Sequence, residues 1–159
     1  MSRLVELTLS KSAWAEISRH AVESFPEECC GIVLRHAVQD EVCRLENIQN
    51  RLHAIDPETY PRQATIAYAI DPQELAKTID KASAAGATVK AFYHSHPNHD
   101  AYFSAEDKAF ATPFGEPTFP DAAQIVISIY DGVVKRMAVF AWDGQRQDFV
   151  EIPLRRLDG

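Results

Sequence analysis

Two histidines one residue apart, His94 and His96, are the residues in this sequence with the clearest chemical potential. On a β-strand, residues i and i+2 point to the same face and lie about 6.6 Å apart. Two imidazoles placed in this way can converge on one metal ion at the Zn–N distance of ~2.0–2.1 Å. A third protein ligand would leave one position open, and this arrangement is typical of catalytic rather than structural zinc sites.

A serine and an aspartate three residues apart, Ser104 and Asp107, follow the histidines. A Ser-x-x-Asp pair at the start of a helix is typical of a capping box, in which side chains satisfy free backbone N–H groups. A serine that caps the helix also fixes the direction of Asp107 in the first turn. The aspartate can therefore be a helix cap, the third metal ligand, or both.

A hydrolytic metal site also needs a base that takes a proton from water and returns it to a leaving amine. Glu28 is a candidate, because it stands where the first predicted helix gives way to a strand. Glu27 and Glu28 are adjacent, and either could be a solvated charge at a helix end. Spacing alone does not choose between these interpretations.

The sequence resembles the JAMM (MPN-plus) zinc metallopeptidases. The family signature H-x-H-x7-S-x2-D is matched at every defined position from His94 to Asp107, and Pro26 begins a match to the upstream element P-x-E-x-x-G. The order of predicted elements is also similar over roughly residues 5–152. Several functional positions in the family order and spacing make this match specific.

The resemblance implies a role for each matched residue. His94, His96 and Asp107 would bind one Zn²⁺ per chain. Glu28 would act first as the general base and then as the general acid. Ser104 would donate a hydrogen bond to the developing oxyanion, a kind of contact worth about 3–4 kcal/mol in the barrier.

The resemblance also implies a substrate class. Family members hydrolyse peptide or isopeptide bonds after the C-terminal Gly-Gly of ubiquitin-like proteins, and small prokaryotic members act on sulfur-carrier proteins. The expected reaction is carrier maturation or release of an amino acid such as cysteine. From position alone, loops 49–65 and 111–122 would flank the channel for the tail. The resemblance does not identify the residue that is released, and it is compatible with a homo-oligomer.

Some residues of this sequence also allow other functions. His94, His96 and His99 match the histidines of the H-x-H-x-D-H motif of metallo-β-lactamases. Asn98, however, stands where that motif needs aspartate. Relatives without the metal signature act as non-catalytic MPN scaffolds, yet no ligand is lost here. A nucleophilic Cys30 has no motif around it. The H-x-E and P-C-x-x-C signature of the zinc deaminases is missing, which disfavours deamination.

The elements that must position these residues can be predicted from hydrophobic periodicity and turn residues. Ser10 or Ser12 begins a helix that ends near Ser24, and Asp71-Pro-Gln-Glu begins a second helix that ends before Gly86. Asp131-Gly132 and Asp143-Gly144 predict two-residue hairpins. The predicted strands are 3–9, 29–35, 41–47, 88–96, 123–130, 133–142 and 146–152, a short helix covers 104–111, and 49–65 is predicted as a long irregular loop.

These elements predict a mixed α/β (α+β-like) fold with a largely antiparallel central sheet flanked by helices. The resemblance implies the cytidine-deaminase-like JAMM/MPN fold. At 159 residues we expect a single domain over 1–159.

Composition limits the partners. The formal net charge of −7 argues against nucleic acid and anionic membranes. No apolar stretch approaches the ~20 residues of a membrane span. The first residues do not form a signal peptide, so we expect a cytoplasmic protein. Three cysteines, two of them adjacent, form neither a disulfide framework nor a zinc ribbon.

Overall fold

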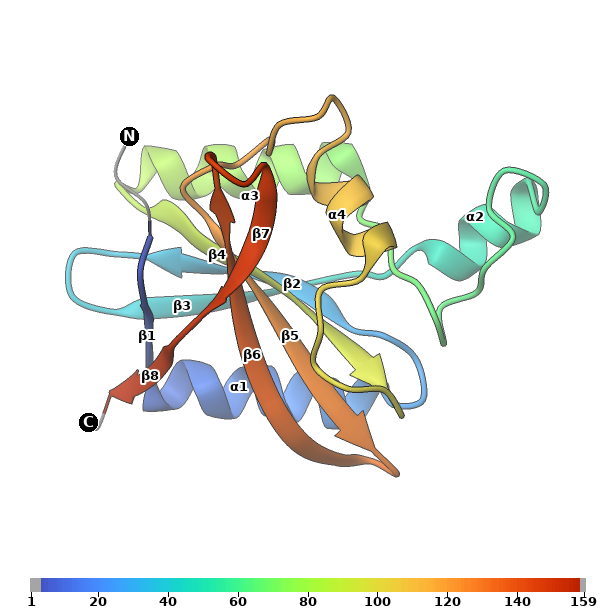
Figure 1. The fold of residues 1–159 in the computed structure, drawn as a ribbon, viewed down its shortest axis with the longest axis horizontal. Coiled ribbons are helices and arrows are strands. Elements are labelled where there is room, and N and C mark those ends of the chain that lie inside the picture. Colours follow the sequence, from blue (N-terminus) through green and yellow to red (C-terminus); the bar gives the residue numbers. More distant parts are fainter. Residues whose placement is uncertain (1–3, 158–159) are drawn as a thin grey trace.

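The protein folds around a six-stranded sheet with helices on both faces (Figure 1). The computed structural model describes residues 4–157. A separate two-stranded sheet joins the first and last strands. The elements are β1 (Leu7–Ser10), α1 (Lys11–Ser24), β2 (Cys30–Arg35), β3 (Asp40–Leu45), α2 (Gln49–Ile55), α3 (Pro72–Ala84), β4 (Thr88–Pro97), α4 (Ala105–Ala111), β5 (Ala123–Tyr130), β6 (Val133–Asp143), β7 (Asp148–Ile152) and β8 (Leu154–Leu157).

The large sheet has the strand order β3-β2-β4-β5-β6-β7. Its neighbours pair antiparallel except for β4 and β5, which are parallel. Parallel neighbours need a long crossover connection. Here the crossover contains α4 and its flanking loops, so the crossover itself carries part of the site. The largely antiparallel sheet flanked by helices confirms the predicted fold class.

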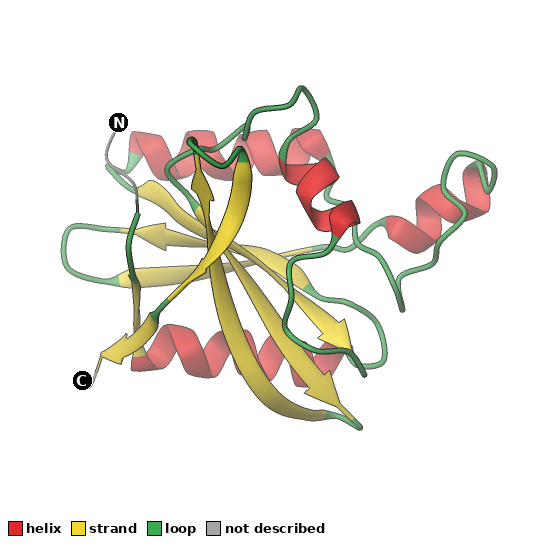
Figure 2. Cartoon of the chain, viewed as in Figure 1, coloured by secondary structure: helices red, strands yellow, loops and turns green. Residues whose placement is uncertain are grey.

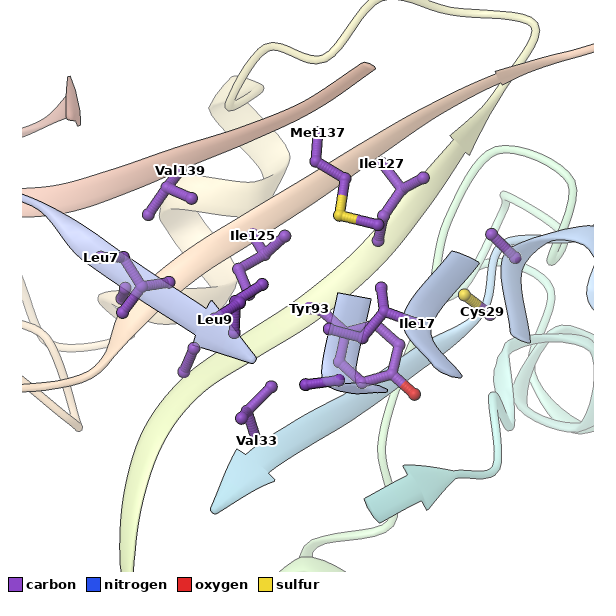
Figure 3. Close-up of a cluster of buried hydrophobic side chains, with 14 of the residues drawn as sticks. Leu7, Leu9, Ile17, Cys29, Val33, Tyr93, Ile125, Ile127, Met137 and Val139 are labelled. Atoms are coloured by element: carbon purple, nitrogen blue, oxygen red, sulfur yellow. The ribbon is translucent and has the colours of Figure 1, made fainter. Parts of the chain in front are cut away.

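One face of the sheet packs against α1. Ile17 and Ala21 of this helix are fully buried against Ile125 and Ile127 of β5, and Tyr93 of β4 belongs to the same core (Figure 3). The apolar residues of α1 lie on one face of the helix, and every second residue of the strands points to one face of the sheet. The core forms where these two apolar faces pack together.

The opposite face packs against α3. Phe92 of β4 and Ile32 of β2 lie in a second core, with Leu75 and Ile79 of α3 against it. Side chains alternate along β4, so residues two and four positions after Phe92 point to the same face as Phe92. These residues are His94 and His96.

Helix starts and one hairpin follow the predicted chemistry. Ser10 caps α1 by accepting a hydrogen bond from the Ala13 N–H, and Asp71 caps α3 with Pro72 at the first position. The Asp131-Gly132 turn joins β5 and β6 with both residues at positive φ, so this prediction is confirmed.

The second hairpin prediction is wrong. The last pair between β6 and β7 is Asp143 with Asp148, which leaves a four-residue loop between them. The Asp143 carboxylate accepts hydrogen bonds from the N–H groups of Gln145 and Arg146, and Gln147 takes a positive φ. The aspartate therefore builds a wider turn around its own side chain.

Two further expectations need correction. The 49–65 segment is not wholly irregular, because it begins with α2, which projects away from the sheet (Figures 1 and 2). The Asn47 side chain accepts the Gln49 N–H at the start of this helix. The first strand was predicted over 3–9 but begins at Leu7, and residue 3 lies outside the described residues. The last strand, β8, was not predicted. No helix within residues 4–157 is long and apolar enough to cross a membrane.

Candidate metal centre

The end of β4 carries both histidines into the interior. His94 is fully buried and His96 nearly so. β4 lies between β2 and β5 in the sheet, so its backbone is paired on both sides. The two imidazoles therefore stand on one face of a strand that cannot shift its register without moving its neighbours.

Asp107 reaches the histidines from α4. Ser104 Oγ accepts the Asp107 N–H at 3.0 Å, and Asp107 Oδ2 accepts the Ser104 N–H at 3.0 Å. This is the predicted capping box. The same carboxylate oxygen faces the histidines, so the capping and ligand interpretations of Asp107 describe one geometry.

Three potential ligand atoms form a nearly equilateral triangle. His94 Nε2 lies 3.1 Å from His96 Nε2 and 3.1 Å from Asp107 Oδ2, and His96 Nε2 lies 3.2 Å from that oxygen. Ligands at ~2.0–2.1 Å in a tetrahedral zinc site lie about 3.3–3.4 Å apart. These residues form the group of the described chain that could hold a metal ion, and their spacing and chemistry fit Zn²⁺.

The two imidazoles are oriented by different means. His96 Nδ1 donates to the Asp100 carbonyl at 3.0 Å, which leaves the Nε2 lone pair directed at the triangle. His94 Nδ1 has no hydrogen-bond partner among the described residues. Instead, the Tyr68 ring stacks on the His94 ring with centroids 4.5 Å apart.

The charges of the group suit a cation. Burial lowers the pKa of His94, which favours the neutral imidazole that binds metals. Burial is also the largest single influence on His96 and acts to lower its pKa. The hydrogen bond and charge of Asp107, the Asp100 carbonyl and the charge of Glu28 together outweigh burial and raise it. Burial alone would raise the pKa of Asp107, yet the two histidines and the Ser104 N–H hold it far below its usual range. Asp107 is therefore ionised.

Glu28 lies beside this group. β2 and β4 pair antiparallel with Cys30 opposite His94, and continuing this register by two residues before β2 brings Glu28 towards His96. The Glu28 N–H donates to the Ala64 carbonyl at 2.8 Å. Its side chain is only 7% exposed.

Burial raises the pKa of Glu28 to about 8. The negative charge of Asp107 adds to the increase, while His96 and Arg62 oppose it. A carboxyl group with a pKa near neutrality can accept a proton and give it back, as a general acid–base must.

The predicted residues meet at a cavity of about 590 Å³. Glu28, His96, Ser104 and Asp107 line it, whereas His94 is buried behind them. The Ser104 hydroxyl accepts one hydrogen bond from the backbone, and its own hydrogen stays available for another partner.

The two predicted flanking segments differ. Residues 59–62 line the cavity, together with Gln49 at the start of α2. From the other side the lining comes from α4 and ends at Phe110, so none of the described lining residues belongs to 111–122.

Residues that sequence reasoning missed support the site from both sides of α2 along the chain. The Asn47 side chain donates to the carbonyls of Glu28 and Ala67 and accepts the N–H groups of Gln49 and Ala69. Tyr68 lies between Ala67 and Ala69, and its ring stacks on His94. A single asparagine or tyrosine carries no periodic signal, so only its position in space shows its role.

His99 and Asp100 take other roles than the metallo-β-lactamase alternative requires. His99 Nδ1 donates to the Pro97 carbonyl at 2.9 Å, and the residue is not in the potential ligand group of the described chain. The Asp100 side chain accepts the Tyr130 hydroxyl. The structure also argues against the alternative of a nucleophilic Cys30. Burial raises the pKa of this residue, so the thiol is held protonated and is not a thiolate.

The fold and the His-His-Asp group together define a protein of the JAB/MPN class. The chain belongs to the family of prokaryotic homologs of the JAB domain, which it matches over residues 10–146. It is 29% identical over 142 residues to a protein of Haloferax volcanii named desampylase, covering 87% of this chain and 88% of the relative.

Solved structures agree on the fold. A protein of Desulfitobacterium hafniense superposes with a TM-score of 0.70 at 22% identity, covering 96% of this chain and 94% of the other. A JAB1/MPN domain protein of Archaeoglobus fulgidus superposes with a TM-score of 0.51 at 17% identity, covering 94% and 99%. At these identities the likeness shows the fold alone.

Proposed function

We propose that this protein is a zinc-dependent metallo(iso)peptidase that cuts after the C-terminal Gly-Gly of a ubiquitin-like or sulfur-carrier protein. One observation carries the proposal. A buried carboxyl group with a raised pKa, that of Glu28, lies in the same cavity as a triangle of zinc-type ligands. Perturbed titratable groups in a cavity are typical of catalytic sites.

The residues of the triangle supply the metal centre of the proposed mechanism. His94, His96 and Asp107 would hold the ion. When bound, Zn²⁺ would supply Lewis-acid chemistry to the scissile carbonyl and the attacking water.

The other residues move protons and stabilise charge. Glu28 takes a proton from the attacking water and delivers it to the leaving amine, so one group serves both halves of the reaction. The Ser104 hydroxyl donates to the carbonyl oxygen as it gains negative charge. Both side chains line the cavity that the substrate would enter.

The substrate class is proposed on the resemblance to JAMM peptidases and on the relative named desampylase. A tail that ends in two glycines suits this cavity, because a backbone without Cβ atoms can lie closest to a buried metal. Tyr60 and Phe110 also line this cavity, on the segment after α2 and on α4.

The test is mass spectrometry of candidate carrier proteins extended beyond Gly-Gly. They are incubated with the zinc-loaded protein and with Glu28→Gln. We expect cleavage after the second glycine by the wild type and a rate lowered by about 10²–10⁴-fold in the variant. Equal cleavage by both would refute the proposed base, and no cleavage across a broad panel would refute the substrate class.

The same experiment addresses the scaffold alternative. A non-catalytic MPN protein would bind a carrier without cutting it. Carrier retained intact on zinc-loaded protein, with the same affinity for wild type and Glu28→Gln, would favour that alternative.

A further inference from the structure

Arg62 is the single lysine or arginine among the described residues that line the cavity. The acidic lining residues are Glu28, Glu106 and Asp107. Arg62 is partly exposed and forms no ion pair with a carboxylate of residues 4–157. Its guanidinium makes one long contact, 3.4 Å from Nη1 to the Ile66 carbonyl. The cavity therefore contains a cation with free donors.

The backbone around Arg62 is held firmly beside the proposed base. The buried Gln49 side chain donates to the Arg62 carbonyl at 3.0 Å. Two residues on, the Ala64 N–H donates to the Asn50 side chain at 2.7 Å, and the Ala64 carbonyl accepts the Glu28 N–H. Arg62 is thus placed relative to Glu28 by a chain of short hydrogen bonds.

The guanidinium of Arg62 and the carboxyl group of Glu28 therefore border the same cavity. The group that returns the proton must lie within hydrogen-bond reach of the leaving amine. Arg62 lies close enough to Glu28 for its charge to act on that carboxylate. If the leaving group is an amino acid, its α-carboxylate is attached to the carbon that bears the amine. A cation that lines the same cavity as the proton donor is therefore available to that carboxylate.

We propose that Arg62 binds the free α-carboxylate of the residue released after Gly-Gly, so that the preferred substrate is a carrier extended by one amino acid. This inference rests on the proposed function and specifies its substrate. The surrounding acidic side chains would repel a carboxylate elsewhere in the cavity, so Arg62 also fixes the direction in which the tail lies. A planar guanidinium can bind the carboxylate with two parallel hydrogen bonds.

An isopeptide-linked substrate would gain nothing from this contact. Its leaving group is a lysine side chain, whose amine is followed by methylene groups instead of a carboxylate. Arg62 consequently separates amino-acid release from removal of a modifier from lysine, two reactions that the same metal centre would otherwise catalyse alike.

The experiment compares two substrates that differ in one group. A ubiquitin-fold protein ending in Gly-Gly-Ala is prepared with a free carboxylate and with a C-terminal amide. For each, kcat/KM is measured with zinc-loaded wild type, Arg62→Met and Arg62→Lys. Arg51→Met is the matched control, because it removes a positive charge from α2 without touching the cavity. Thermal unfolding checks that each variant is folded.

We expect the wild type to prefer the free acid by about 10–100-fold, the range of a charge-assisted hydrogen bond. Arg62→Met should abolish this preference, Arg62→Lys should keep part of it, and Arg51→Met should keep all of it. Any general effect of Arg62 on Glu28 cancels in the ratio of the two substrates. A wild type that cleaves acid and amide equally, or a preference that survives in Arg62→Met, overturns the inference.

Binding gives a second readout that does not depend on turnover. The peptide Gly-Gly-Ala, as acid and as amide, is titrated into metal-free wild type and Arg62→Met by calorimetry. Tighter binding of the acid in the wild type alone supports the role of Arg62, and equal binding of both peptides refutes it. Failure to cleave any extended carrier, with this binding difference intact, would count against the proposed reaction and leave the carboxylate site standing.

Discussion

His94, His96 and Asp107 form a ligand set in which each side chain is held by a different kind of contact. A backbone carbonyl orients His96, a stacked Tyr68 ring orients His94, and the helix cap at Ser104 orients the aspartate. Such supporting contacts fix the ligand atoms before a metal arrives. The site is therefore sensitive to residues that never touch the ion.

Substitutions should separate ligation from capping. Asp107→Ala removes a ligand and should abolish zinc retention, whereas His99→Ala should leave one zinc per chain. Ser104→Ala removes the cap but leaves the carboxylate, so it should retain zinc and lose about 10²–10³-fold in kcat. Zinc per chain, measured by elemental mass spectrometry after dialysis, checks all three. Zinc loss in His99→Ala with retention in Asp107→Ala would favour the metallo-β-lactamase assignment.

The raised pKa of Glu28 predicts a pH dependence of stability in the metal-free protein. Its pKa is about 8 in the folded state and near 4.5 when unfolded, so the folded state binds the proton more tightly. This contribution is fully present below about pH 4.5 and is lost as pH rises through 8, with a total on the order of a few kcal/mol.

Urea unfolding of chelator-treated protein between pH 5 and 9 measures this effect. The comparison is with Glu28→Gln, which cannot titrate at this position. We expect the difference in unfolding free energy between the two proteins to fall steadily as pH rises. Parallel pH profiles would show that the Glu28 carboxyl does not titrate in this range.

At the scale of elements, Gly31, three residues after Glu28, has a packing role. A Cβ on Gly31 would lie 2.5 Å from the ring atoms of Tyr93 on the neighbouring strand. The Tyr93 hydroxyl in turn lies 2.6 Å from His20 Nδ1 on α1. The tyrosine crosses β2 at a point where only glycine leaves room, and this contact joins α1 to the face of the sheet opposite the histidines.

Gly31→Ala should therefore destabilise the protein by about 1–3 kcal/mol through overpacking. The cost should shrink in a Tyr93→Leu background, where the ring is gone, but not in Tyr93→Phe, which keeps most of the clashing atoms. Gly144→Ala is the matched control, since its nearest neighbour is 4.0 Å away and it should cost little. Denaturant unfolding measures each cost. Equal costs in every Tyr93 background would rule out this clash.

At the scale of the whole molecule, the two ends of the described chain pair with each other. β1 and β8 run parallel with Leu7 opposite Leu154. Leu7 and Leu9 are buried in the core beneath α1. The C-terminal strand thus covers an edge that would otherwise expose backbone groups next to the core.

Deleting residues 154–159 should lower stability by on the order of 2 kcal/mol, because it removes the ladder and the packing of Leu154. Zinc binding should persist, since the ligands belong to β4 and α4. Thermal unfolding and zinc content check both parts, with a deletion of 158–159 as the control. An unchanged melting temperature would mean that β8 contributes nothing to stability.

Local patterns in the sequence predicted most of the framework. The caps at Ser10 and Asp71, the turn at Asp131-Gly132 and the buried strands each depend on neighbouring residues, so they can be recognised along the chain. The motif from His94 to Asp107 belongs to the same category, because its members share one strand and the helix that follows.

Other features were decided only by the tertiary structure. The approach of Glu28 to the cavity that His96 lines depends on the register of β2 against β4, and a one-residue slip would turn its side chain to the other face. The stacking of Tyr68 and the presence of Arg62 in the cavity depend on how the segment after α2 folds back over the site. The sequence by itself determined which residues could bind a metal and move a proton. Long-range strand pairing and the returning loop decided which of them meet in one cavity, because contacts between distant segments leave no periodic signal in the chain.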